Sequence, residues 1–203
     1  MEIEIRSNDY AEIRGYVNVV ERFSKPIRGF GKKFVEKVKT GTFNTSINEA
    51  KNENRAIKLL IDHNESRCLA DTVAGNLELK EDNIGLKIHS IITNPKDIEE
   101  IRSGTPKGFS FGFVVKADHF EEKTDSEVEE RTLEKIKLEE VSLLINQTPA
   151  YLATSVEVRA DNAEELELRC CEDVKLIDNR KKQEVGTDSV EAYKQRVDYL
   201  KLI

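Results

Sequence analysis

Three residues in this chain have side chains that together can break an acyl bond by nucleophilic catalysis: Ser110, His63 and Glu140. A serine hydroxyl attacks a carbonyl carbon when a neighbouring imidazole takes its proton. A carboxylate that accepts a hydrogen bond from the imidazole fixes its tautomer and stabilises its charged form. Because these residue types occur in any chain of this length, they are weak evidence until the elements that carry them are considered.

The serine lies in a predicted strand, Gly108–Val115, that is apolar on one face. Its three phenylalanines stand at alternate positions, so they share the face that packs on a core. Ser110 and Gly112 share the other face, and a glycine inside a strand often marks a place where another chain or a ligand approaches closely. This is a suitable setting for a nucleophile. An ordinary solvent-facing serine on an edge strand is the alternative that the octapeptide leaves open.

The histidine ends the stretch Ala56–His63, which predicts another strand. Ile57, Leu59 and Ile61 share one parity, and His63 continues it. We therefore expect the imidazole at the end of this strand, on its buried face.

The glutamate lies in a long predicted strand, Thr132–Leu144. Leu138 and Glu140 have the same parity, whereas Val141 has the other, so the strand is either buried on both faces or bulged near Glu139. A buried carboxylate needs a partner because its desolvation alone is costly. A buried pair of histidine and glutamate satisfies this need.

The remaining pattern predicts a mainly β, α+β fold with about seven strands in a barrel or sandwich with helical insertions. Further strands are predicted over residues 2–6, 13–23, 72–79, 84–92 and 154–159, and helices over 34–38, 95–102, 164–172 and 190–202. Residues 42–54 are predicted to be a polar connection, and 118–131 a surface loop or an extended hairpin. Residues 1–160 form the predicted compact domain, and 161–203 a charged, partly helical tail or partner segment.

Composition limits the function classes. The chain has 203 residues, with 32 basic against 39 acidic ones and a net charge of -7, which argues against a general nucleic-acid binder. Its three cysteines fit a reducing compartment. No apolar run is long enough to cross a membrane and no signal peptide is evident, so we expect an intracellular protein. The histidines are not spaced like zinc ligands, and no cofactor or metal is expected.

Several motifs, taken in order, resemble the prohead proteases of tailed bacteriophages. They are DHN at 62–64, GFSFGF at 108–113, and EVSL at 140–143 followed by PAY at 149–151. The resemblance covers about residues 10–160. This family is similar to the herpesvirus capsid maturation proteases (assemblins). The resemblance therefore implies a closed or nearly closed β-barrel surrounded by a few helices, and a serine endopeptidase.

The resemblance also implies roles for individual residues. His63 matches the catalytic histidine and Ser110 the nucleophile, while Glu140 is the candidate third member, with Glu139 and Asp62 as alternatives. The oxyanion hole is placed around residues 148–150.

The implied substrates are the major capsid protein and the scaffold precursor, inside the assembling procapsid in the host bacterial cytoplasm. Self-cleavage is an open alternative. A homo-oligomer, dimer or higher, is expected, without nucleic acid or membrane. The competing hypothesis is a catalytically inactive capsid-assembly or scaffolding protein that retains the fold, motivated by the acidic segment 161–203.

Overall fold

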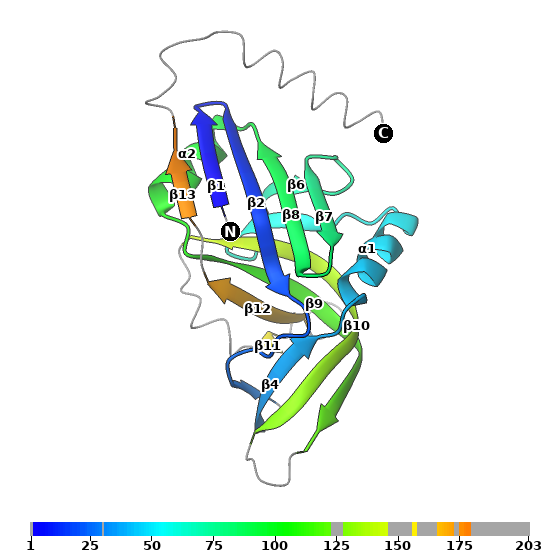
Figure 1. Cartoon of the computed structure of the whole chain (residues 1–203). Coiled ribbons are helices and arrows are strands. Elements are labelled where there is room, and N and C mark those ends of the chain that lie inside the picture. The colour runs from blue at the N-terminus through cyan, green and yellow to red at the C-terminus, as the bar shows by residue number, and fades with distance from the viewer. Residues whose placement is uncertain are drawn as a thin grey trace.

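Two β-sheets and two helices make up the part of the chain that the computed structural model describes, residues 2–29, 31–122, 128–145, 156–157, 166–172 and 175–179 (Figure 1). The smaller sheet has the strand order β13-β1-β2-β8-β7, with the bounds Lys175–Asp178, Glu2–Ser7, Tyr10–Val19, Gly85–Ile92 and Leu77–Glu81. The larger sheet has the order β11-β12-β9-β10-β4-β3, with the bounds Val156–Glu157, Leu166–Glu172, Gly108–Glu121, Glu129–Leu144, Lys32–Val38 and Ile27–Gly29. β5 (Lys58–Ile61) joins the larger sheet through β10 and continues into β6 (Asn64–Asp71).

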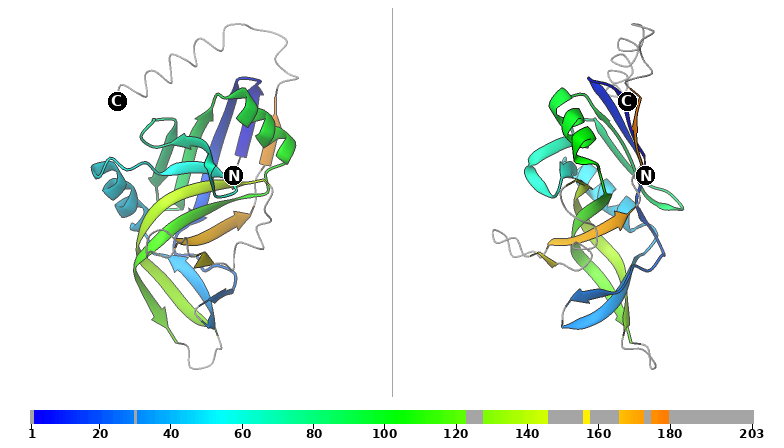
Figure 2. Two further views of the ribbon diagram at one scale, coloured as in Figure 1. Left: turned by 180° about the vertical axis from the view of Figure 1, so that it is seen from behind. Right: turned by 90° about the vertical axis from the view of Figure 1, so that its left-hand side faces the viewer.

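The mainly β, α+β class is confirmed, but the strand count is higher than the predicted seven and the predicted barrel is not confirmed. Within the described ranges, each sheet has strands at both ends of its order with a single neighbour, so neither sheet closes on itself. The β9–β10 hairpin contains the two longest strands among the described residues. It bends as it passes from beside the smaller sheet to the end that carries β4 (Figure 2).

The core lies on the phenylalanine face of β9. Phe109, Phe111 and Phe113 have no exposed surface, as the alternation predicted. Phe43 of α1 (Thr42–Asn52) meets the ring of Phe111 edge to face, with the ring centroids 5.4 Å apart. The opposite face of β9 is therefore the one that carries Ser110.

The local sequence predicted one of the two helices, α2, but not the other, α1. α2 (Pro95–Gly104) has the predicted cap, because the Asn94 side chain accepts a hydrogen bond from the N–H of Lys96. α1 was missed, and the helix predicted over 34–38 is wrong, since Lys32–Val38 is strand β4, paired in parallel with β10. The carboxylate of Glu81, on β7, accepts two backbone N–H groups at the start of α1. Because the capping residue comes from a strand that is distant in the sequence, the residues next to α1 do not predict where the helix begins.

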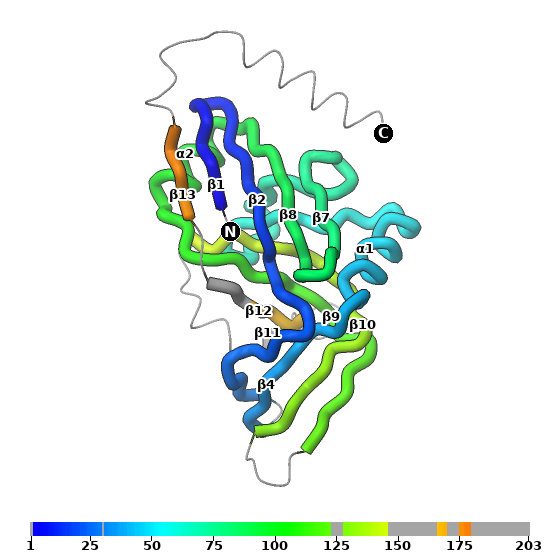
Figure 3. The backbone as a smooth tube through the Cα atoms, in the orientation of Figure 1, coloured from blue at the N-terminus to red at the C-terminus, as the bar shows by residue number. Residues whose placement is uncertain are grey.

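The helix predicted over 164–172 is also wrong, because Leu166–Glu172 is strand β12, antiparallel to β9. The coloured end of the β12 tube lies beside β9 (Figure 3). Its alternate residues Glu167 and Arg169 enter a buried network of ion pairs with Arg131 and Glu36. Alternation of this kind has the period of a strand, and the ionic partners allow charged residues to be buried. The helix predicted over 190–202 lies outside the described residues, as does most of the strand predicted over 154–159.

Candidate active site

His63 lies in a two-residue turn that joins β5 to β6. Asp62 and His63 have φ values of 50° and 59°, both in the left-handed region, and Ile61 pairs with Asn64 across the turn. Hairpin turns with two left-handed residues favour asparagine and glycine. Residues with a Cβ adopt this conformation at a cost in free energy, so the surrounding structure must hold them.

Strand β10 and Ile145, the residue that follows it, hold this turn through hydrogen bonds. The N–H of Asp62 donates to the carbonyl of Leu143 (3.0 Å), and Asp62 Oδ1 accepts from the N–H of Ile145 (2.8 Å). The N–H of His63 donates to the hydroxyl oxygen of Ser142 (3.1 Å). These bonds fix His63 against one edge of β10, although His63 itself lies in a turn and not in a strand.

Glu140 owes its position to an irregularity in β10. The register with β9 shifts between Leu138 and Glu140, which confirms the predicted bulge near Glu139. After the shift, Glu140 lies opposite Gly112 and Ser142 lies opposite Ser110. The bulge therefore moves Glu140 from the core face, where Leu138 is buried, to the face that carries the serine.

The side chains of His63 and Glu140 meet in a buried contact, each about 5 % exposed. His63 Nδ1 lies 2.5 Å from Glu140 Oε1, and Ser142 Oγ lies 2.5 Å from Glu140 Oε2. Ser142 Oγ accepts the N–H of His63, so its own proton goes to the carboxylate. A carboxylate that accepts at both oxygens takes the Nδ1 proton of a neutral imidazole and leaves the lone pair on Nε2.

Ser110 lies on the other side of β10 from His63, in β9 between β10 and β12. Its side chain has no exposed surface, and among the described residues its Oγ has no hydrogen-bond partner. Gly112, two positions along, makes room for the acid. A Cβ at position 112 would lie 2.6 Å from Glu140 Oε1. The close approach that the glycine predicted is therefore made here by a carboxylate of the same chain.

The alternatives for the third residue point elsewhere. Glu139 forms ion pairs with Arg55 (3.2 Å) and Lys137 (2.6 Å), and Asp62 binds the backbone of β10. Sequence reasoning missed Ser142 as a partner of the site. Ser142 could have been found from its position, because it lies two residues after Glu140 in the same strand and therefore on the same face. The predicted oxyanion-hole segment 148–150 lies outside the described residues.

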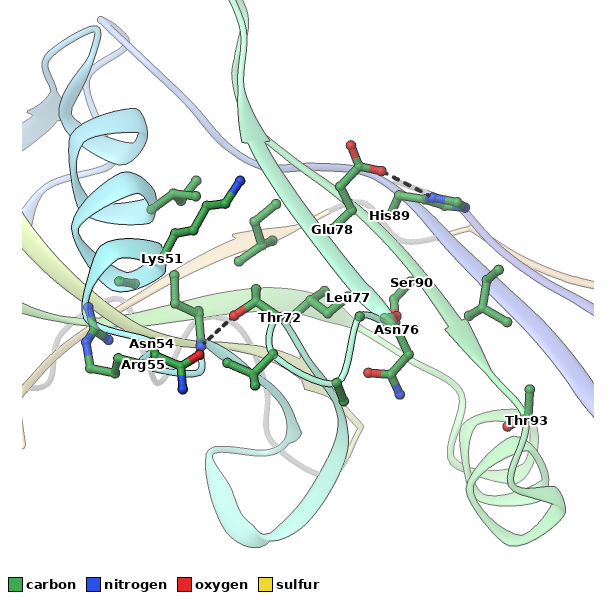
Figure 4. Close-up of a pocket in the computed structure, with 18 residues that line it drawn as sticks. Lys51, Asn54, Arg55, Thr72, Asn76, Leu77, Glu78, His89, Ser90 and Thr93 are labelled. Atoms are coloured by element: carbon green, nitrogen blue, oxygen red, sulfur yellow. Dashed lines mark hydrogen bonds and ion pairs between the residues drawn. The ribbon is translucent and has the colours of Figure 1, made fainter. Parts of the chain in front are cut away.

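The cavity in Figure 4 is separate from these residues. It has a volume of about 870 Å³ and lies among α1, β7, β8 and the segment before β7. Lys51 and Arg55 line it from the α1 side, and His89 lines it from β8 beside Glu78 (Figure 4). None of His63, Ser110 and Glu140 is among its lining residues.

Neither a candidate metal site nor a membrane-spanning helix is found in the described ranges. No group of three or more histidine, cysteine, aspartate or glutamate residues there could hold a metal ion. No helix of this part of the chain is long and apolar enough to cross a membrane.

Comparison with known proteins places the chain in a family. Residues 1–169 match the model of the caudovirus prohead serine protease family. A comparison with curated proteins gives no match, and a comparison with solved structures gives none. The family match spans β1 to β10 and reaches into β12, so it includes the turn of His63, the strand of Ser110 and the bulge of Glu140. The chain belongs to the caudovirus prohead serine protease family.

Proposed function

We propose that this chain is the endopeptidase that cleaves scaffold and capsid precursors inside a phage procapsid. Ser110 is the nucleophile, His63 the general base and Glu140 the orienting acid. The observation that carries the proposal is the buried contact of His63 Nδ1 with Glu140 Oε1, on the sheet face that bears Ser110. Family membership supports the reaction class.

The proposed reaction follows the usual order of a serine peptidase. His63 Nε2 takes the proton of Ser110 Oγ as the oxygen attacks the scissile carbonyl carbon, and the imidazolium then gives that proton to the leaving amine. Water repeats the sequence on the acyl-enzyme and releases the second product. Glu140 remains ionised throughout and stabilises the imidazolium. Because Ser110 has no exposed surface in this conformation, a peptide reaches it only after the residues that cover it move.

Co-expression with the capsid precursor, followed by intact-mass analysis, tests the proposal. Wild type is compared with Ser110→Ala and with Ser103→Ala, a matched control whose hydroxyl is exposed on α2 and bonds to backbone carbonyls of its own helix. We expect truncated precursor with wild type and with Ser103→Ala, and full-length precursor with Ser110→Ala. Identical masses in all three would favour a catalytically inactive assembly protein.

The third residue is tested by a matched pair of neighbouring glutamates. Glu140→Gln keeps the shape but cannot hold His63 in the required tautomer, so kcat falls by about 10⁴-fold. Glu139→Gln removes only partly exposed ion pairs and leaves kcat unchanged. The reverse order of effects would assign the role to Glu139.

A further inference from the structure

We propose that Ser142 is a positioning residue that couples the base to the acid, an inference that rests on the proposed function. Its hydroxyl touches both the backbone of His63 and the carboxylate of Glu140. Its own role is not chemical: it holds two partners of the reaction in one arrangement.

The geometry uses the hydroxyl as both acceptor and donor. Ser142 Oγ accepts the N–H of His63 at 3.1 Å and donates to Glu140 Oε2 at 2.5 Å. Its side chain has no exposed surface, so water does not replace these bonds. Ser142 also lies directly opposite Ser110 in the β9–β10 register, which places the hydroxyl between the base and the nucleophile strand.

Each of the two bonds opposes a particular displacement. The bond to His63 N–H holds a residue whose left-handed backbone is unfavourable for a side chain with a Cβ. The bond to Glu140 Oε2 prevents the carboxylate from rotating away, so that Oε1 stays on Nδ1. The hydrogen bond between Nδ1 and Oε1 determines which imidazole nitrogen carries the lone pair. Because that bond forms only when His63 and Glu140 are both in place, both bonds of Ser142 are needed.

Alanine at this position removes both bonds at once. The backbone of His63 loses an acceptor, and Glu140 loses a donor in a buried site where water cannot substitute. A shift of about 1 Å in a reacting group costs on the order of 10²-fold in rate. Threonine retains a hydroxyl, whereas valine has the same shape as threonine and lacks it.

The kinetic test compares Ser142→Ala, Ser142→Thr and Ser142→Val on a precursor-derived peptide. We expect kcat to fall by about 10²-fold in the alanine and valine variants, with KM within about threefold of wild type. Threonine restores kcat to within about tenfold. Equal losses in threonine and valine, or a loss confined to KM, would overturn the inference and leave Ser142 a packing residue.

A second measurement does not depend on cleavage. The chain has three histidines, so the ¹⁵N resonances of His63 are assigned by comparison with His63→Gln in a Ser110→Ala background. We expect a single tautomer with the proton on Nδ1, and a mixture of tautomers after Ser142→Ala. An unchanged single tautomer in Ser142→Ala would refute the coupling. The expected tautomers, found while the wild-type chain with Ser110 intact cleaves no precursor, would instead refute the proposed function alone.

Discussion

Gly112→Ala tests the arrangement of the site from the side of β9. The added Cβ would lie 2.6 Å from Glu140 Oε1 and 3.1 Å from Glu140 Cγ, whereas ordinary contacts begin at 3.4 Å. The carboxylate must therefore retreat by about 0.8 Å (3.4 minus 2.6). The same oxygen lies 2.5 Å from His63 Nδ1, so a movement of this size cannot leave that hydrogen bond unchanged.

The expected loss is in catalysis and not in folding. A displacement of this size costs on the order of 10²-fold in kcat. The carboxylate is the far end of a flexible side chain, and alanine in a strand is more favourable than glycine by roughly 0.5–1 kcal/mol. We therefore expect the free energy of unfolding to stay within about 1 kcal/mol of wild type.

A double-mutant cycle isolates the contact. Precursor-peptide kinetics and urea unfolding are measured for Gly112→Ala, Glu140→Asp and the double variant. Aspartate is shorter and withdraws its oxygens from position 112, so adding Gly112→Ala to it lowers kcat by less than about tenfold. Wild-type kcat in Gly112→Ala, or the same 10²-fold loss in both backgrounds, would refute the reasoning.

Three further predictions concern the elements that support the site. Arg169→Met leaves Glu36 and Glu167 short of a buried cation, so the free energy of unfolding falls by roughly 3–5 kcal/mol in urea titrations. Burial raises the pKa of Glu167, but its bonds to Arg131 and Arg169 outweigh burial and hold the pKa below the ordinary value of 4.5. The stability that ionised Glu167 contributes is thus complete above pH 4.5, and it is lost as the pH falls through the lower pKa of the folded state. We therefore expect that Glu167→Gln weakens the dependence of the urea midpoint on pH in that acid range. Glu81→Ala removes the cap of α1, lowers stability by roughly 0.5–2 kcal/mol and speeds amide exchange in the first turn of α1.

Each of these has an outcome that contradicts it. Arg169→Met with unchanged stability would show that the network around β12 is not required for folding. A pH profile that Glu167→Gln leaves unaltered would place the acid sensitivity in another carboxyl group, such as Glu12, whose pKa is also lowered: burial raises it, and bonds to Arg14 and His89 outweigh burial. Unchanged exchange in α1 after Glu81→Ala would show that packing of Phe43 is sufficient to start the helix.

Local pattern was sufficient for much of the fold. The alternation of phenylalanines with Ser110 and Gly112 predicted the face of β9 that packs on the core, although the opposite face is buried as well over Gly108–Val114. Asn94, followed by proline and acids, predicted α2 and its cap. These features are determined locally because the period of two along a strand and the capping of a helix involve neighbours in the chain.

The same local reasoning failed where partners are distant. β4 was predicted to be a helix, although alternate residues of it are buried beside β10. β12 was also predicted to be a helix, because its many charged residues were taken to face solvent. In the structure Glu167 and Arg169 are buried in ion pairs with Arg131 and Glu36. Burial of charge depends on ions brought from other strands, and no local window contains them.

For the candidate site, the sequence by itself determined the residue types and predicted a buried pair of His63 and Glu140, which the structure brings into contact. It also left open whether β10 is buried on both faces or bulged near Glu139, and the structure shows both: the register on β9 shifts before Glu140, and every residue from Glu140 to Leu144 is buried. Tertiary structure alone decided that a left-handed turn carries His63, that Gly112 makes room for the carboxylate and that Ser142 joins the two. The reason is physical: these contacts join residues up to about 80 positions apart, and strand pairing brings them together only when the sheet forms.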